Sequence, residues 1–467
     1  MNSINKMTTL FQHKKTIAGI LGLILFFSIA FLGSGSLENR AIAMGLLMVV
    51  FWIFEVVPIY VTALIPLVLA TPMGLLDPTE LALAYGNNNV YLFLGGFILA
   101  LALEKWEVHH QIASRILALV GSTKSKILIG FGLSSFLLSM WISNTATTLM
   151  MLPMALSIIQ VQKESEASNR FSLLLMLTVA YSASIGGMAT LVGSPPNTQM
   201  AGTLSNAFDI HVSFWEWMKI GLPVSFLVFL ILNLFFQFLL GSQGKDKVLV
   251  NIHQSRWTGP QRRVLMIFAI VIVFWITRDL IVGYTGVVFK DSSVAILGGI
   301  ALFLIPSENP KQKLLHWRDT VKIPWGILVL FGGGIALASS LEKSHVLELI
   351  IQNAGVISSW NYIVLLLLII SLSIFATELM SNLALVSVLV PIIAMMALGI
   401  GESVMALCVP LTLAASCAFM MPISTPPNAI VFSSGKISIK QMAAYGFFMN
   451  IFSVIIILTV SYTHLTL

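Results

Sequence analysis

The sequence Ser143-Asn144-Thr145-Ala146 interrupts a long apolar segment, and Ser381-Asn382-Leu383-Ala384 interrupts a second one. Each motif stands 39 residues after a Glu-Lys pair, at Glu104-Lys105 and at Glu342-Lys343, so the two copies are 238 residues apart. Polar, helix-breaking motifs that recur in order within apolar segments are typical of membrane transporters built from two structural repeats. The pattern therefore predicts both an architecture and a transport function.

A second pair of motifs follows in the same order, Ser194-Pro195-Pro196-Asn197 and then Thr425-Pro426-Pro427-Asn428. Consecutive prolines remove two amide donors and force the preceding residue out of the helical conformation. They predict broken helices over 171–203 and 405–433, with a plain kink as the alternative. The asparagine after each proline pair, and the flexible Gly193 or Ser424 before it, favour an unwound segment that faces a ligand. Pro195 and Pro426 are therefore candidate substrate-binding residues.

The composition is that of a membrane protein. Of the 467 residues, 57% are hydrophobic and 9% are charged, whereas roughly 25% of the residues of a soluble domain are charged. Apolar runs near the ~20 residues needed to cross a bilayer recur from end to end. We expect an all-α polytopic protein with about eleven spans, at 16–33, 41–57, 59–76, 89–104, 171–203, 214–240, 264–283, 292–306, 324–341, 405–433 and 440–460.

The basic residues predict the orientation of these spans. With a cytoplasmic N-terminus and an outside C-terminus, 20 of the 25 Lys and Arg residues lie on the cytoplasmic side. The positive-inside rule favours this arrangement in the cell membrane. The net charge of +6 is thus a topology signal and does not indicate nucleic-acid binding.

The expected domain organisation follows the repeat. Residues 1–33 resemble a signal peptide, but the long apolar stretch without a convincing cleavage site favours an uncleaved helix. We assign 34–240 to a first repeat, 241–263 to a cytoplasmic linker, 264–460 to a second repeat and 461–467 to a tail. The two cysteines lie in one apolar segment and suggest neither a disulfide framework nor a metal site.

The segments 126–160 and 361–396 are each too long for one membrane span and too short for two. As a single helix, 126–160 would be about 50 Å long, which exceeds the thickness of a bilayer core, and 361–396 has a similar length. A re-entrant hairpin that turns at the Ser-Asn motif solves it in both cases. The orientation above makes the first hairpin enter from the cytoplasm and the second from outside, which predicts inverted repeats.

A backbone turn at membrane depth is tolerated where it is buried in protein or lines a wet cavity. Helix ends there leave N–H and C=O groups without partners: the N–H groups suit an anion, and the carbonyls suit a small hard cation. A single Ser-Asn in a membrane helix usually makes an interhelical hydrogen bond. Two copies at matched positions, each at the centre of a hairpin, favour a ligand site instead.

With these motifs and Pro58-Ile59-Tyr60-Val61-Thr62-Ala63-Leu64-Ile65-Pro66, the chain resembles the divalent anion/sodium symporter (DASS) family over essentially its whole length. That family carries dicarboxylates, citrate or sulfate. The resemblance implies a homodimer in which each protomer has a scaffold domain and a transport domain that moves like an elevator. It also implies Na⁺ as the coupling ion, at two or more sites, and a small dianion as the substrate.

The resemblance also implies the roles of individual residues. The substrate carboxylates would be bound by Asn144, Thr145 and Asn382. The first sodium site would comprise Ser139, Ser143, Asn144 and Gly193, and the second Thr377, Met380, Asn382 and Ser424, partly through backbone carbonyls. Leu383 departs from the family pattern, because many dicarboxylate carriers have Thr there. If Leu383 lies beside the anion, it gives the site an apolar wall and bears on the choice of substrate.

Other polar residues in or near the apolar segments have competing explanations. Glu55, Glu104 and Glu378 are carboxylates at positions where charge is costly and often functional. Glu378 either tunes the site or makes structural hydrogen bonds. Glu104-Lys105 and Glu342-Lys343 are expected at helix ends, and His109-His110 in a surface segment. Gly95-Gly96 and Gly332-Gly333-Gly334 are expected to permit close helix packing.

We therefore expect a sodium-coupled importer of C4-dicarboxylates such as succinate, malate or fumarate, and not an enzyme. A sodium-independent dicarboxylate exchanger and a carrier of citrate or sulfate remain alternatives. An intramembrane hydrolase would need a nucleophile–base pair or a metal cluster, and neither motif is present. A substrate-sensing receptor would share the site without transporting its ligand.

Overall fold

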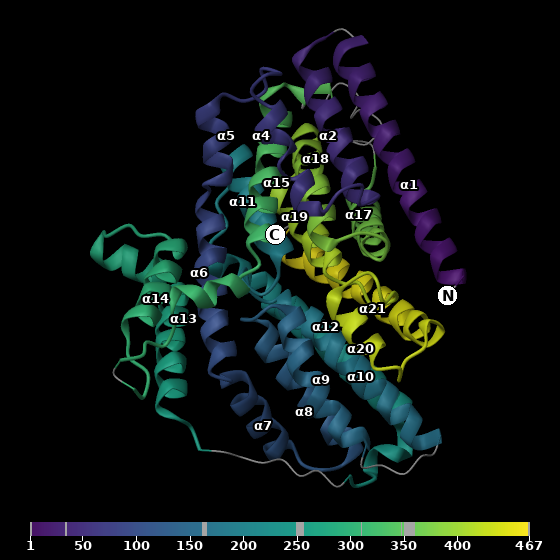
Figure 1. The fold of residues 1–467 in the computed structure, drawn as a ribbon, viewed down its shortest axis with the longest axis vertical. Helices are drawn as coiled ribbons and strands as arrows, with labels where there is room; N and C mark the ends of the chain where they lie inside the picture. The colour runs from purple at the N-terminus through teal and green to yellow at the C-terminus, as the bar shows by residue number, and fades with distance from the viewer. Residues whose placement is uncertain are drawn as a thin grey trace.

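The computed structural model describes residues 2–32, 35–160, 166–248, 256–309, 311–346, 348–349 and 360–465. Parts of the expected linker 241–263 and tail 461–467 lie outside these residues. The described chain is helical and has no strand, only the isolated β-bridges 123–247 and 306–313. In Figure 1, α8 and α9 lie in the lower half of the view, and α17 and α18 lie in the upper half.

The helices have the following bounds, in chain order: α1 Asn2–Phe27, α2 Leu37–Ile53, α3 Ile59–Thr62, α4 Ile65–Leu69, α5 Pro78–Tyr85, α6 Asn88–Lys105, α7 Val108–Val120, α8 Lys124–Ser139, α9 Asn144–Gln160, α10 Glu166–Gly187, α11 Pro195–Ala207, α12 Phe214–Leu240, α13 Gly259–Thr285, α14 Asp291–Leu304, α15 Trp325–Lys343, α17 Tyr362–Thr377, α18 Asn382–Ile400, α19 Val404–Ala415, α20 Pro426–Ser433 and α21 Ile439–Leu465. Three short non-α helices are η1 Ser28–Leu32, η2 Gly241–Lys245 and η3 Trp317–Lys322.

Local sequence explains where the helices begin. Ser213 accepts a hydrogen bond from the Glu216 N–H, and Glu216 accepts one from the Ser213 N–H, which forms a capping box at α12. Pro195 and Pro426 occupy the first positions of α11 and α20, where the missing N–H would have no helical partner. The prolines that break the long apolar segments therefore also begin the next helices.

Within the described chain, seven helical stretches are long and apolar enough to cross a membrane by length and composition. They are Pro78–Lys105, Asn169–Gly187, Phe214–Lys245, Gly259–Thr285, Trp325–Lys343, Asn382–Ile400 and Ile439–Thr463. Shorter apolar helices accompany them, so the prediction of an all-α, multi-pass membrane protein is confirmed. The expected span 59–76 is not one helix. It divides into α3 and α4, because Pro66 lacks the N–H that would continue α3.

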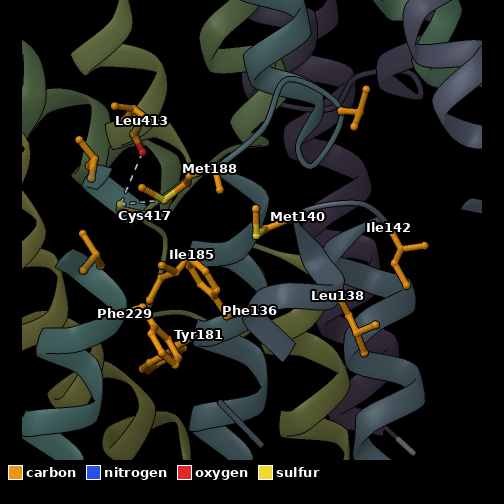
Figure 2. Packing of buried hydrophobic residues seen from close by; sticks show 14 of the residues in the cluster. Phe136, Leu138, Met140, Ile142, Tyr181, Ile185, Met188, Phe229, Leu413 and Cys417 are labelled. Carbon is orange, nitrogen blue, oxygen red and sulfur yellow. Dashed lines mark hydrogen bonds between the residues drawn. The ribbon is translucent and has the colours of Figure 1, made fainter. Parts of the chain in front are cut away.

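Buried apolar side chains form two clusters. The first joins α8–α12 to α17–α21, and Figure 2 shows part of it, including Tyr181, Met188 and Cys417. The second joins α2, α6 and α15 to one face of α18. Close packing at the glycines is confirmed, since a methyl group at Gly95 would lie 2.5 Å from Cβ of Ala295 in α14. Both cysteines are buried and free.

Candidate functional site

The first Ser-Asn motif stands where α9 begins. Helices α8 and α9 are joined by residues 140–143, and the Asn144 side chain turns back towards the end of α8. One atom of its amide lies 2.7 Å from Oγ of the buried Ser139. The same position lies 3.3 Å from the carbonyl oxygens of Ala183 and Gly193. The fold thus brings three of the four predicted first-site residues together and adds the Ala183 carbonyl.

The Asn144 amide fits this group of oxygens in two orientations. With Nδ2 inward, it donates to Ser139 Oγ and to the Ala183 and Gly193 carbonyls. With Oδ1 inward, it accepts a hydrogen bond from the Ser139 hydroxyl at 2.7 Å and lies 3.3 Å from the Ala183 and Gly193 carbonyl oxygens, an acceptor set of the kind that suits a cation. A half-turn of this amide therefore presents either a donor or an acceptor to the same group of oxygens.

The start of α9 offers N–H groups as well as oxygens. Ser143 Oγ accepts a hydrogen bond of 3.2 Å from the Ala146 N–H, which is how the fourth predicted residue is used. The N–H groups of Asn144 and Thr145 point out of the first helical turn, where no intrahelical acceptor exists. Thr145 is half-buried and adds a hydroxyl. Tip 1, which we define as residues 139–145, therefore combines oxygens of the kind that suit a cation with a helix N-terminus of the kind that suits an anion.

The second motif repeats this geometry in tip 2, defined as residues 377–383. Helix α17 ends at Thr377, and α18 begins at Asn382. Oγ1 of the buried Thr377 lies 2.7 Å from Oδ1 of Asn382 and 2.8 Å from the Ala415 carbonyl oxygen. Met380 lies in the turn and is half-buried. The hydroxyl–amide pair Thr377–Asn382 stands 238 residues after Ser139–Asn144, as the sequence repeat requires.

Two loops interrupt the broken helices: loop 1 (residues 188–194) between α10 and α11, and loop 2 (residues 416–425) between α19 and α20. Asn197 Nδ2 donates to the Gly187 and Thr190 carbonyls at 2.9 and 2.8 Å. Asn428 Nδ2 makes the equivalent bonds to Ala418 and Met421 at 3.0 and 3.1 Å. Both asparagines are fully buried, so their amides hold the unwound loops in shape.

The remaining loop candidates differ in exposure. Ser424 is buried, and its hydroxyl donates to the Met421 carbonyl at 2.7 Å. Pro195 is half-buried and Pro426 is exposed. Leu383 is 6% exposed and belongs to the second apolar cluster. This placement favours packing over ligand contact for the Leu383 side chain.

The two repeats meet around these elements. Helix α9, which starts at tip 1, packs against α20, and α18, which starts at tip 2, packs against α11. The loops also touch, since Cys417 Sγ lies 3.8 Å from Met188 Sδ (Figure 2). Tyr181 of α10 donates to the Phe419 carbonyl at 2.6 Å. The candidate residues of the two repeats are therefore carried by elements that pack against one another.

The other polar candidates have structural partners. Glu55 lies 3.7 Å from Lys15, and the two Glu-Lys pairs stand at the ends of α6 and α15, as predicted. His109 is buried with Nδ1 3.2 Å from the Leu103 carbonyl, so the surface position expected for it was wrong. No group of three His, Cys, Asp or Glu side chains in the described chain is placed to hold a metal.

Gly187 is a site residue that sequence reasoning missed. A methyl group there would overlap Oδ1 of Asn144 and lie 3.0 Å from its Cγ and Nδ2. The absence of a side chain at Gly187 therefore makes room for the Asn144 amide. The pair Gly186-Gly187, which stands at the end of α10, was the available signal.

Comparisons with known proteins identify the family of this chain. Residues 13–466 match the family described as "Sodium:sulfate symporter transmembrane region". The sodium-dependent dicarboxylate transporter SdcS of Staphylococcus saprophyticus is 34% identical over 466 residues, which cover 95% of this chain and 90% of SdcS. The protein of the same name from Staphylococcus aureus strain USA300 is 35% identical over 477 residues, covering 97% and 91%.

A solved structure shows the same fold. The crystal structure of the Alcanivorax borkumensis YdaH transporter has a TM-score of 0.62 and 16% sequence identity, and the match covers 83% of this chain and 89% of that one. The family match spans nearly the whole chain and includes both tips and both loops. This chain therefore belongs to the sodium:sulfate symporter family, the divalent anion/sodium symporters that its motifs resemble.

Proposed function

We propose that this protein couples the inward movement of sodium to the uptake of a small dicarboxylate dianion, such as succinate, malate or fumarate. The observation that carries the proposal is the paired tip. Each tip sets an asparagine amide beside a buried hydroxyl, and the next helix begins at that asparagine. The names of the SdcS relatives support sodium and a dicarboxylate as the two cargoes.

The charges at the site supply a physical reason for coupling. Tips 1 and 2 and loops 1 and 2 contain no Lys or Arg. A dianion must then be neutralised by N–H groups at helix N-termini and by bound cations. Since a buried charge without compensation is costly, the anion binds well only when sodium occupies the adjacent oxygens. Binding of one cargo therefore favours binding of the other.

We infer at least two sodium ions per dianion, one at each tip. Two ions would make transport electroneutral. Each further charge is worth ~2.3 kcal/mol per 100 mV, so a third ion would let the membrane potential drive uptake. The first repeat (34–240) and the inverted second repeat (264–460) would enclose the site. In a homodimer of such protomers, the part carrying the tips would move as an elevator against the rest.

The test uses purified protein in liposomes that contain no substrate. We expect an inward-directed sodium gradient alone to drive uptake of labelled succinate, with unlabelled citrate and sulfate competing less well. A negative-inside potential, set with potassium and valinomycin, separates a stoichiometry of two from a higher one. Uptake that does not depend on sodium and requires dicarboxylate inside the liposomes would identify an exchanger instead. Preferential uptake of sulfate or citrate would overturn the choice of substrate.

The buried hydroxyls of the tips give a separate prediction. Ser139→Ala and Thr377→Ala should each raise the half-saturating sodium concentration about threefold to tenfold, since one net hydrogen bond is worth ~0.5–1.5 kcal/mol. Competition between succinate, citrate and sulfate should stay as in the wild type. Sodium titration of uptake measures the effect, and Ser157→Ala, at an exposed position of α9, is the control. An unchanged sodium dependence with weaker substrate binding would place the cations elsewhere.

A further inference from the structure

The two loops differ in length, although their anchors correspond. Asn197 bonds to the carbonyl of Gly187, ten residues before it, and Asn428 bonds to that of Ala418, also ten residues before it. Helix α10 continues to Gly187, whereas α19 ends at Ala415, three residues short of Ala418. The break in the second repeat is therefore longer, and it exposes more backbone that needs partners.

The carboxylate of Glu378 partners this extra backbone. Its Oε1 accepts from the N–H groups of Phe419 and Met420 at 2.7 and 2.8 Å, and its Oε2 accepts from that of Met421 at 3.0 Å. Asn450 of α21 donates to Oε1 at 2.9 Å. Glu378 is only 4% exposed. One side chain at the end of α17 thus links tip 2, loop 2 and α21.

The first repeat does without such a carboxylate. The position equivalent to Glu378, 238 residues earlier, is Met140. In the shorter loop 1, the N–H groups of Met188 and Ala189 reach the carbonyls three residues before them, each at 3.1 Å. The carboxylate therefore occurs in the repeat whose helix stops early, which identifies the loop it serves.

Fixing these N–H groups also fixes the oxygens of the candidate second sodium site. The Met421 carbonyl accepts from Ser424 Oγ and from Asn428, and Thr377 is the residue before Glu378. Among the described residues, no Lys or Arg forms an ion pair with Glu378. Its negative charge therefore remains available to attract a cation, in a setting where screening by water is weak.

We propose that Glu378 is a positioning residue for the second cation site. Its carboxylate holds loop 2 in the shape in which Ser424 and tip 2 present their oxygens, and it supplies a fixed negative charge beside them. The inference rests on the proposed function, because it requires that sodium binds at tip 2.

The main test is Glu378→Gln in the full-length protein, with sodium binding followed as the rise in melting temperature during a sodium titration. The amide has nearly the same size, but its Nε2 faces the Met421 N–H, a donor. We expect the half-saturating sodium concentration to rise at least tenfold, while the KM for succinate at saturating sodium changes less than threefold. Glu378→Asp keeps the charge on a shorter side chain and should recover part of the sodium affinity.

Two further variants keep the test decisive. Glu402→Gln makes the same chemical change at an exposed position beyond α18 and should leave the titration unchanged. Asn450→Leu removes one donor to Glu378 from outside the tip and should shift the titration twofold to threefold in the same direction. This variant decides the matter if Glu378→Gln does not fold.

The outcomes separate the two proposals. A folded Glu378→Gln protein with wild-type sodium titration would overturn the positioning role. So would a loss of succinate affinity at saturating sodium with no change in sodium affinity. If the wild-type protein itself shows no stabilisation by sodium, in contrast to choline chloride at equal ionic strength, the proposed function fails and this inference fails with it.

Discussion

Asn144→Ala and Asn382→Ala should each lower sodium-driven succinate uptake at least 100-fold, a free-energy loss of about 2.8 kcal/mol. At tip 1, the Asn144 amide is the group that faces Ser139, Ala183 and Gly193 together. Its removal takes away a proposed cation ligand, and it leaves buried oxygens without a donor when no cation is present. At tip 2, Asn382 is bonded to Thr377, so the same argument applies there.

The measurement is initial uptake into proteoliposomes at matched protein content, with melting temperature as the check on folding. Asn233→Ala is a matched control, because Asn233 is half-buried in α12 and its amide bonds to the Phe229 carbonyl of its own helix at 2.8 Å. We expect that variant to transport nearly normally. Near-normal uptake by either tip variant would show that the site lies elsewhere.

The fold class could be read from the sequence because its signals are large. Long apolar runs decide the membrane class, and a polar interruption within such a run has few structural solutions. Both Ser-Asn motifs lie where a turn between paired helices, 140–143 or 378–381, meets the first residue of the next helix. The expectation of a single span at 59–76 was wrong, because hydropathy averages over the short helices α3 and α4.

The side-chain part of the candidate site was more accessible to sequence reasoning than the backbone part. Serine, threonine and asparagine stand out in an apolar segment, and the family resemblance assigned Ser139 and Thr377 to the sodium sites. A carbonyl oxygen carries no residue signature, and Ala183 is indistinguishable from other alanines in a buried helix. Its inclusion depends on how α10 packs against α8 and α9, which only the three-dimensional structure reveals.

The Pro-Pro-Asn motifs show a different kind of ambiguity. They were expected to mark an unwound segment that faces a ligand, and their asparagines, Asn197 and Asn428, donate to carbonyls within the broken segments. Because proline has no N–H, the carbonyls that would accept from it in a helix lack a donor, and the side-chain amide of the nearby asparagine donates to carbonyls of the broken segment instead. A polar residue beside a helix break therefore has a structural use that sequence alone does not separate from ligand binding.

The last prediction concerns Gly187→Ala, which we expect to lower uptake at least 100-fold. The added methyl group would overlap Oδ1 of Asn144 and force the amide away from Ser139 and Gly193. Helix propensity alone predicts no loss of stability, because Ala is a better helix former than Gly and Gly187 is the last residue of α10. If the variant still folds but loses both transport and the stabilisation by sodium that we assign to tip 1, the cause is the displaced Asn144 amide and not a general loss of stability.

Gly283→Ala is the matched control, since it lies in α13 with no atom near the added methyl group. The second repeat gives an internal comparison as well. Its equivalent of Gly187 is Ala418, which already carries a methyl group beyond the end of α19. Because the longer loop 2 places this residue outside a helix, Ala418→Gly should change sodium affinity little. Equal losses of sodium affinity in Gly187→Ala and Ala418→Gly would contradict this prediction. They would show that the different lengths of loops 1 and 2 do not make the two positions differ in their effect on the sites.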